Sequence, residues 1–297
     1  MKFVIVGLGS IGKRHQKNLE VLGHEVVPCH QDDNLEQILD KNKPDGVLIC
    51  NPTSLHIPTA IVVANAGYPM FLEKPVSHNL KGLDKLIQII KQKSLMVQVG
   101  YNLRFEPELM KIKQQLVGKQ FGRVYSARIV AGSYFPDWRS NIDYKQNYGA
   151  RLDLGGGVIL DLSHEIDYAV WLFGKANKVS AMIKKAPELE IETEAIGQLN
   201  IEFDSGVIAQ IQVDYLSRKY RRNMEIVTEK KTVYWDYAEL KEKGWNSNEM
   251  FINELKHFIN AIKSEIKPTP TIDEGKYVLE IIEAAKKSNK SGRMIKL

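Results

Sequence analysis

The sequence predicts an α/β protein with two domains. These are a doubly wound parallel-sheet domain over residues 1–122 and an α+β domain over residues 123–297, with a large, open-faced, mostly antiparallel sheet. In the first hundred residues, short apolar runs without polar alternation are spaced by helical patterns, which is typical of strands buried on both faces of a parallel sheet. After about Gly122 apolar and polar residues alternate, as in strands with one buried face. A length of 297 residues also favours two domains.

The first domain is expected to alternate strands with helices along its whole length. The glycine-rich stretch that follows the first apolar run predicts a tight turn between a strand and a helix. The expected strands are residues 3–6, 24–28, 46–50, 70–72 and 95–99, and the expected helices are residues 11–22, 34–40, 57–66 and 80–91.

The second domain is expected to contain a sheet covered by helices on one face only. Asp204-Ser205-Gly206 supplies a tight hairpin turn between two of its strands. The other face would remain available to a partner, so homo-oligomerisation through it is expected, as a homodimer or homotetramer. The expected strands are 124–130, 178–183, 195–203, 207–215, 223–228 and 232–237, and the expected helices are 158–173, 250–262 and 272–288.

Composition and charge exclude several classes of protein. The 41 basic and 36 acidic residues leave a net charge of +5, which is too small to indicate a nucleic-acid or membrane partner. Cys29 and Cys50 are the two cysteines, and they predict free thiols in a reducing compartment. Neither a secretory signal nor a membrane span is apparent, so a soluble cytoplasmic protein is expected.

A glycine-rich motif indicates a dinucleotide site. Residues 7–12 read Gly7-Leu8-Gly9-Ser10-Ile11-Gly12, between an apolar strand and a helix. The first glycine permits the tight turn, the second lets the backbone approach a pyrophosphate, and the third lets the helix pack on the strand. A glycine-rich turn without a ligand is the alternative interpretation.

The cofactor is expected to be NAD, with NADP as the open alternative. The acidic residue that usually holds the adenosine ribose, about 20 positions after the glycine motif, is missing from its expected place. Asp32 and Asp33 are the nearest acidic residues, and both lie beyond the expected position in the sequence. No arginine stands there to hold a 2′-phosphate.

Further motifs in order along the chain resemble the glucose–fructose oxidoreductase / inositol dehydrogenase / rhizopine-catabolism (Gfo/Idh/MocA) family. The central one is Glu73-Lys74-Pro75 at the end of a strand. The resemblance runs almost from end to end. The other motifs are Asn51-Pro52-Thr53 with His56, the segment Tyr101-Asn102-Leu103-Arg104-Phe105, Gly155-Gly156-Gly157 followed by Asp161, His164 and Asp167, and residues 288–297.

The resemblance implies a Rossmann domain and a nicotinamide-dependent oxidoreductase, with Lys74 as a catalytic base. Oxidising a secondary alcohol requires a general base beside the nicotinamide, and a lysine serves when burial and the cationic ring favour its neutral form. A surface or paired Lys74 is the alternative. The Lys74–Pro75 bond is a candidate for cis geometry. The residues expected to contact the cofactor are Gly7, Gly9, Ser10, Ile11, Gly12, Asn51, Pro52, Thr53, His56, Glu73 and Lys74, with a local structural hydrogen bond expected for His56.

Asp161 and His164 stand three apart in a segment that the pattern predicts to be one helix, so they would share a face. By resemblance this segment lines the substrate pocket, with His164 as proton shuttle or alternative base and Asp161 as a ligand of a sugar hydroxyl. The family more often separates these two residues by four positions. A buried, structurally hydrogen-bonded pair is the alternative interpretation.

Four further residues are candidates for substrate binding. Arg104 suits a carboxylate or phosphate, although a structural salt bridge is nearly as plausible. Tyr134, Trp138 and Arg139 form an aromatic and charged cluster suited to stacking on a sugar or base, or to local packing. No cysteine and histidine spacing suggests zinc, and no metal is expected.

The favoured hypothesis is an NAD(P)-dependent oxidoreductase that acts on a secondary alcohol or keto group of a sugar. By resemblance to family members of surface-polysaccharide biosynthesis, a nucleotide sugar or acidic sugar is the expected substrate. One alternative is a glycoside-eliminating enzyme or lyase on the same fold that retains its NAD. Another is a non-catalytic dinucleotide-binding regulator.

Overall fold

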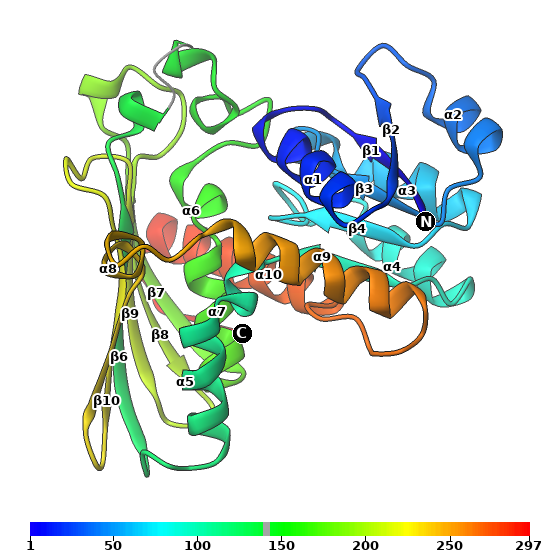
Figure 1. The fold of residues 1–297 in the computed structure, drawn as a ribbon. Helices are drawn as coiled ribbons and strands as arrows, with labels where there is room; N and C mark the ends of the chain where they lie inside the picture. The colour runs from blue at the N-terminus through cyan, green and yellow to red at the C-terminus, as the bar shows by residue number, and fades with distance from the viewer. Residues whose placement is uncertain (139–142) are drawn as a thin grey trace. The chain divides into compact units, whose positions relative to one another are not determined.

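The computed structural model describes residues 1–138 and 143–297, and the chain divides into two compact units (Figure 1). The first unit comprises Met1–Asn102 and Asn248–Leu279, and the second comprises Leu103–Ser247 and Glu280–Leu297. The division therefore differs from the expected boundary after Gly122. Residues 103–122 group with the second unit, and a segment near the carboxyl terminus returns to the first.

The first unit contains a parallel sheet in the order β2-β1-β3-β4-β5. The pairings between its strands, all within the described residues 1–138, are parallel, and each strand lies in the chain where an apolar run predicts one. The doubly wound prediction is confirmed. The strands are β1 (Lys2–Val6), β2 (Glu25–Cys29), β3 (Gly46–Ile49), β4 (Met70–Glu73) and β5 (Val97–Gly100).

Helices cover the sheet on both faces, because the chain leaves β1 toward β2 but leaves β3 toward β4 and β5, and right-handed crossovers in opposite directions place helices on opposite faces. On one face α1 packs beside α9, and on the other α2, α3 and α4 are neighbours. The helices are α1 (Ser10–Val21), α2 (Leu35–Asn42), α3 (His56–Ala66), α4 (Leu83–Gln92) and α9 (Asn248–Ile262).

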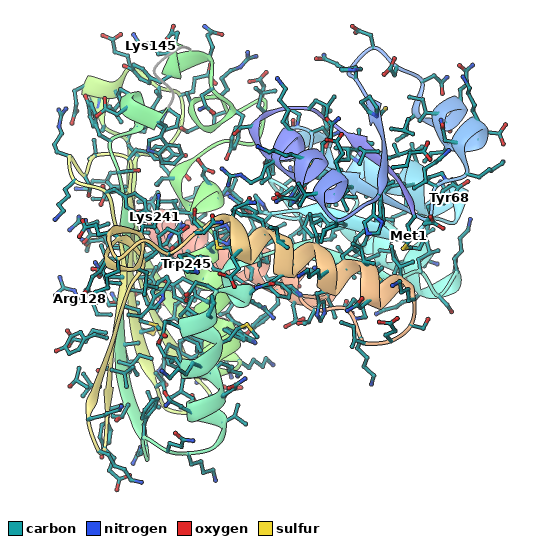
Figure 2. All side chains as sticks on the ribbon, in the orientation of Figure 1. Met1, Tyr68, Arg128, Lys145, Lys241 and Trp245 are labelled. Carbon is teal, nitrogen blue, oxygen red and sulfur yellow. The ribbon has the colours of Figure 1, made fainter. Side chains whose placement is uncertain are left out.

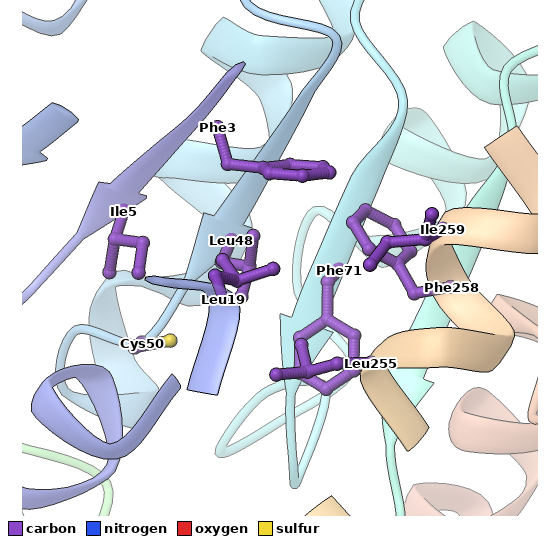
Figure 3. Close-up of a cluster of buried hydrophobic side chains, with 9 residues drawn as sticks. All are labelled: Phe3, Ile5, Leu19, Leu48, Cys50, Phe71, Leu255, Phe258 and Ile259. Carbon is purple, nitrogen blue, oxygen red and sulfur yellow. The ribbon is translucent and has the colours of Figure 1, made fainter. Parts of the chain in front are cut away.

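Helix α9 closes the core of the first unit. Its residues Leu255, Phe258 and Ile259 meet Phe3 and Phe71 of the sheet (Figure 3). Gly46 permits this approach, since a Cβ there would lie 2.9 Å from the Ile262 side chain. The first unit therefore takes one of its core helices from the far end of the chain.

The second unit contains a seven-stranded sheet in the order β11-β10-β6-β9-β8-β7-β12. In the described part of the chain, β6 with β9 is the parallel pair and the other pairings are antiparallel. The mostly antiparallel sheet is thus confirmed. The strands are β6 (Val124–Gly132), β7 (Ala176–Lys184), β8 (Ile196–Phe203), β9 (Ile208–Asp214), β10 (Arg221–Thr228), β11 (Thr232–Asp236) and β12 (Ile295–Lys296).

One face of this sheet packs against helices and the other is open. Helices α5 and α7 run beside the covered face, while Arg128 projects from the opposite side (Figures 1 and 2). Met182, Ile208 and Tyr234 are large apolar side chains exposed on the sheet. The helices that belong wholly or partly to this unit are α5 (Pro107–Val117), α6 (Val158–Asp161), α7 (His164–Phe173), α8 (Tyr237–Glu242) and α10 (Ile272–Ser291), which begins in the first unit.

The single helix expected over residues 158–173 is wrong. The segment forms two helices, α6 and α7, with the break at Leu162 and Ser163. The φ/ψ of Leu162 is −97°/35°, outside the helical region, and its amide bonds back to Val158. The shared helical face expected for Asp161 and His164 therefore does not exist, because each belongs to a different helix.

Both cysteines are free and buried, in agreement with the expected thiols. Within residues 1–138 and 143–297, no helix is long and apolar enough to cross a membrane.

Candidate active site

Three of the sequence motifs lie at one edge of the parallel sheet. The glycine motif follows β1, Asn51 follows β3 and Lys74 follows β4, and these strands are neighbours in the order β1-β3-β4. Carboxyl ends of parallel strands meet at a common edge. The chain also leaves β1 and β3 in opposite directions, and ligands bind where the strand order reverses in this way.

The turn formed by residues 7–12 is called the glycine cradle here. Its three glycines have different steric roles. Gly7 has φ +91°, and a Cβ on it would lie 2.6 Å from the Asn51 amide nitrogen, so only glycine fits. A Cβ on Gly12 would lie 2.0 Å from the Gly7 carbonyl oxygen, which shows how closely α1 packs on the turn. A Cβ on Gly9 would meet nothing within 4 Å. The open space at Gly9 fits a phosphate group approaching the backbone.

The amino terminus of α1 is also suited to an anion. Gly9 caps it without a side-chain hydrogen bond, and its first turn holds no acidic residue. Free amides and the helix dipole at such a terminus attract phosphate. Ser10 is exposed and Ile11 is half-buried at this end of the helix. These residues fit the pyrophosphate of a dinucleotide.

The end of β2 lies beside the glycine turn. The Cys29 carbonyl there accepts a hydrogen bond from the Gly7 amide at 3.1 Å. The Asp33 carboxylate accepts the amide of His30 at 2.7 Å and so closes its own loop. Asp32 is exposed.

Glu73 is buried beneath the Lys74 turn. Its carboxylate accepts a hydrogen bond from His15 Nε2 at 2.7 Å and another from the Lys74 amide at 3.2 Å. His15 is fully buried in α1 and its ring lies against Phe71. Lys74 is half-buried, and the Lys74–Pro75 bond is cis, as the resemblance implies. The carboxylate thus joins α1, the helix after the glycine motif, to the Lys74 turn.

The Asn51-Pro52-Thr53 segment and His56 form the adjoining wall. The His56 ring lies 2.9 Å from the Asn51 carbonyl oxygen and 2.8 Å from that of Pro75. Asn51 donates through its side chain to Thr59, Pro52 is exposed and Thr53 is buried. His56 therefore links the two loops that follow β3 and β4.

In the second unit, Asp161 is held by two tyrosines. The Tyr215 hydroxyl donates to Oδ2 at 3.0 Å, and the Tyr148 hydroxyl donates to Oδ1. Tyr215 is fully buried and stacks on Phe135, and burial raises the pKa of Tyr215 well above its usual range, with the Asp161 charge adding to the effect. This geometry supports the structural hydrogen-bonding interpretation of Asp161, with Tyr148 and Tyr215 as its partners.

The triple glycine shapes the backbone before Asp161. A Cβ on Gly156 would lie 2.2 Å from the Tyr148 carbonyl oxygen, and one on Gly157 would lie 2.4 Å from Glu194 Oε1. The short helical turn that begins at Tyr148 can pass this close only because glycine lacks a side chain. Burial raises the pKa of Glu194.

His164 begins α7 and is buried. One turn further along, the Asp167 carboxylate accepts two hydrogen bonds from Arg104, from Nε at 2.9 Å and from Nη2 at 2.7 Å. The Arg104 guanidinium is thus engaged in a buried ion pair. This supports the salt-bridge interpretation of Arg104 over substrate binding.

The aromatic cluster is a packed unit. The Trp138 ring meets Phe135 and Tyr215 edge-on, with centroids 5.1 and 5.3 Å away. The Tyr134 ring is covered by Arg218, whose guanidinium carbon lies 3.6 Å from the ring centroid. Arg139 lies outside the described residues.

Four residues of these arrangements were missed by the sequence analysis. Tyr148, Tyr215 and Arg218 reach their partners from elements that are distant in the sequence. No local spacing signals such contacts. For His15, the available signal was its position one turn into the helix after the glycine motif.

Comparisons with known proteins identify the family of the chain. Residues 23–101 match the model for an oxidoreductase family with an NAD-binding Rossmann fold, and residues 109–234 match the GFO/IDH/MocA C-terminal domain. Myo-inositol 2-dehydrogenase from Thermotoga maritima is 25% identical, covering 100% of this chain and 98% of its own length.

Solved structures share the fold over the whole chain. GenD2 from gentamicin A biosynthesis, in complex with NAD, superposes with a TM-score of 0.88 at 20% identity, covering 100% of this chain and 96% of its own. The WlbA dehydrogenase from Chromobacterium violaceum, in complex with NADH and UDP-GlcNAcA, gives 0.85 at 22% identity, with the same coverage. The chain belongs to the GFO/IDH/MocA family of NAD-binding oxidoreductases.

Proposed function

We propose that the protein transfers a hydride between NAD and a secondary alcohol or keto group of a sugar. The observation that carries the proposal is the position of Lys74. It follows β4 at the same sheet edge as the glycine cradle, on a turn tied through Glu73 to the helix that begins at that cradle. A base in this place is what alcohol oxidation requires.

Each candidate residue has a separate role in this proposal. Bound NAD supplies the hydride acceptor. Lys74 accepts the proton of the substrate hydroxyl, and His164 is the proton shuttle or alternative base. Asp161, fixed by Tyr148 and Tyr215, orients a sugar hydroxyl rather than acting as the base, since its carboxylate already accepts two hydrogen bonds.

An acidic or nucleotide-linked sugar is the proposed substrate class. The likeness to a dehydrogenase crystallised with UDP-GlcNAcA supports it. With Arg104 engaged by Asp167, the exposed Arg218 on the face of Tyr134 becomes the candidate for binding the anionic group, together with Tyr134, Trp138 and Arg139. Substitution Arg218→Ala should then raise the KM for an acidic sugar more than for its neutral counterpart.

The test is a panel of nucleotide sugars, acidic sugars and inositols, assayed with NAD and with NADH by nicotinamide absorbance. Substitution Lys74→Met should lower kcat at least about 100-fold while NADH still binds, because acid–base catalysis contributes about that much. Turnover within threefold of wild type would overturn the role of Lys74. Product formation without a net change in NADH would instead identify an enzyme that retains its NAD and eliminates.

We further propose that the protein is a cytoplasmic homodimer or homotetramer assembled through the open face of the seven-stranded sheet. Exposed Met182, Ile208 and Tyr234 support this, as does a hollow of about 470 Å³ lined in part by Arg128 and Tyr234. The buried free thiols suit a reducing compartment. Light scattering should give a multimer, and substitution Ile208→Asp should give monomers.

A further inference from the structure

His56 is a buried histidine at this sheet edge, and the hydrogen bonds it can make depend on its protonation state. It is 2% exposed and begins α3, between the loop after β3 and the turn after β4. Its Nδ1 lies 2.8 Å from the carbonyl oxygen of Pro75, and its Nε2 lies 2.9 Å from that of Asn51. Both partners are main-chain carbonyls.

A carbonyl oxygen accepts hydrogen bonds and never donates them. Neutral imidazole carries one N–H and therefore satisfies one of the two carbonyls, while its other nitrogen turns a lone pair toward the second. The imidazolium ion carries two N–H groups and satisfies both. The observed geometry is therefore complete only when His56 is protonated.

Some features around His56 disfavour its protonated form and others favour it. Burial lowers the pKa of His56 below its usual 6.5, while the carbonyls of Pro75 and Asn51 act to raise it. The Glu73 carboxylate also raises it and the Lys74 ammonium lowers it. Both charged residues directly precede Pro75, whose carbonyl oxygen His56 contacts. Without a further anion, His56 is mostly neutral at pH 7 and one carbonyl lacks a donor.

A bound dinucleotide supplies such an anion. The Asn51 backbone packs on Gly7 so closely that a Cβ on Gly7 would lie 2.6 Å from the Asn51 nitrogen. The His56 ring contacts the same residue, through the carbonyl oxygen of Asn51. A pyrophosphate held by the glycine cradle would bring negative charge to this region, and negative charge favours the cationic form of a nearby histidine.

We propose that His56 is a proton-operated positioning residue, which takes up one proton when a dinucleotide binds and then donates to both Asn51 and Pro75. The proton comes from the solvent, and no covalent bond changes. With both bonds made, the Lys74 turn is fixed relative to the cradle. The inference rests on the cofactor half of the proposed function.

The direct test is ¹⁵N NMR of the histidine ring nitrogens. In the free protein, lowering the pH should convert His56 from one protonated nitrogen to two, with a midpoint below 6.5. Saturating NADH should move that midpoint upward. The His56→Gln variant identifies the signal by its loss. A His56 ring that stays neutral with NADH bound, at a pH below its free midpoint, would overturn the proposal.

Calorimetry measures the proton itself. NADH binding at pH 7, compared in two buffers of different ionisation enthalpy, should show net proton uptake by the wild type. The uptake should be lost in His56→Gln and kept in His257→Gln, a matched control whose histidine in α9 bonds the Lys267 carbonyl. Equal uptake by wild type and His56→Gln would overturn the proposal.

Kinetic measurements distinguish a positioning role of His56 from a purely structural one. In His56→Gln, kcat should fall about tenfold because the Lys74 turn is held less firmly in its catalytic position, and the dependence of kcat on pH between 5.5 and 7.5 should flatten. A tenfold loss with an unchanged pH profile would indicate a structural role only. Failure of the proposed function is distinguishable, because a protein that binds no dinucleotide can still be titrated by NMR.

Discussion

Arg104 and Asp167 form a bidentate ion pair inside the second unit. Nε and Nη2 of the guanidinium each donate to a different carboxylate oxygen, and the side chains are 3% and 1% exposed. The Arg104 guanidinium carbon also lies 5.9 Å from the Trp171 ring centroid. Asp167 already occupies two donor groups of the guanidinium, which supports a structural role for the pair.

Substitution Asp167→Asn should lower the free energy of unfolding by about 3–5 kcal/mol, because it leaves the guanidinium as a buried charge without its counterion. Urea unfolding followed by circular dichroism measures this. The matched control is Asp153→Asn, which breaks the exposed pair with Arg151 and should leave the midpoint unchanged. Equal effects of the two variants would contradict the structural role.

Substitutions Gly9→Ala and Gly12→Ala should separate cofactor binding from folding. A methyl group at Gly9 meets nothing in the protein and φ is −67°, so stability should be kept while the Kd for NADH rises at least about tenfold. At Gly12 the methyl group would lie 2.0 Å from a carbonyl oxygen, so the melting temperature itself should fall. Unchanged NADH binding by Gly9→Ala would argue against a phosphate in this space.

Removing the hydroxyls around Asp161 should give non-additive losses. Tyr215→Phe alone should cost about 1–3 kcal/mol of unfolding free energy, since it deprives a buried carboxylate of a donor. Tyr148→Phe removes the other hydroxyl. The double variant should lose more than the sum of the two, by about 0.5–3 kcal/mol, because Asp161 then keeps neither tyrosine. An additive double-mutant cycle would show that the two bonds are independent.

The stability of the protein should depend on pH through His56. Burial places its pKa in the folded protein below 6.5, so the unfolded chain binds the proton more readily. The unfolded state gains protons first as the pH falls below about 7, and the free energy of unfolding therefore declines with it, by at most about 1.4 kcal/mol per pH unit from one histidine. His24 and His257 act in the same direction. Unfolding between pH 5 and 7 should thus show a shallower decline in His56→Gln than in wild type.

Much of the fold was predictable because strong local patterns coincide with tertiary contacts. Most buried strands of the first unit carry apolar runs, and the glycine motif marks the first turn by its steric requirement. Each is a property of adjacent residues. The alternating strands of the second unit were readable for the same reason, since one of their faces is packed and the other is open.

The rest depends on contacts between distant segments. Nothing near Asn248 signals that α9 covers the first sheet, because any amphipathic helix fits many apolar faces. The break between Asp161 and His164 interrupts a segment whose pattern stays apolar. Periodicity alone therefore predicts one helix where the structure has two. Arg104 looked available for a ligand because its partner, Asp167, lies 63 residues further along.

The position of α9 also governs the order in which this chain can fold during synthesis. Residues 1–102 leave the ribosome with all five strands of the first sheet, yet Leu255, Phe258 and Ile259, which cover Phe3 and Phe71, follow only after residues 103–247. The part of one sheet face that lies beside α1 stays uncovered for that interval and is a natural target for chaperones. A fragment that ends at Asn102 should therefore aggregate, whereas one joined by a short linker to residues 248–279 has the parts of a complete core.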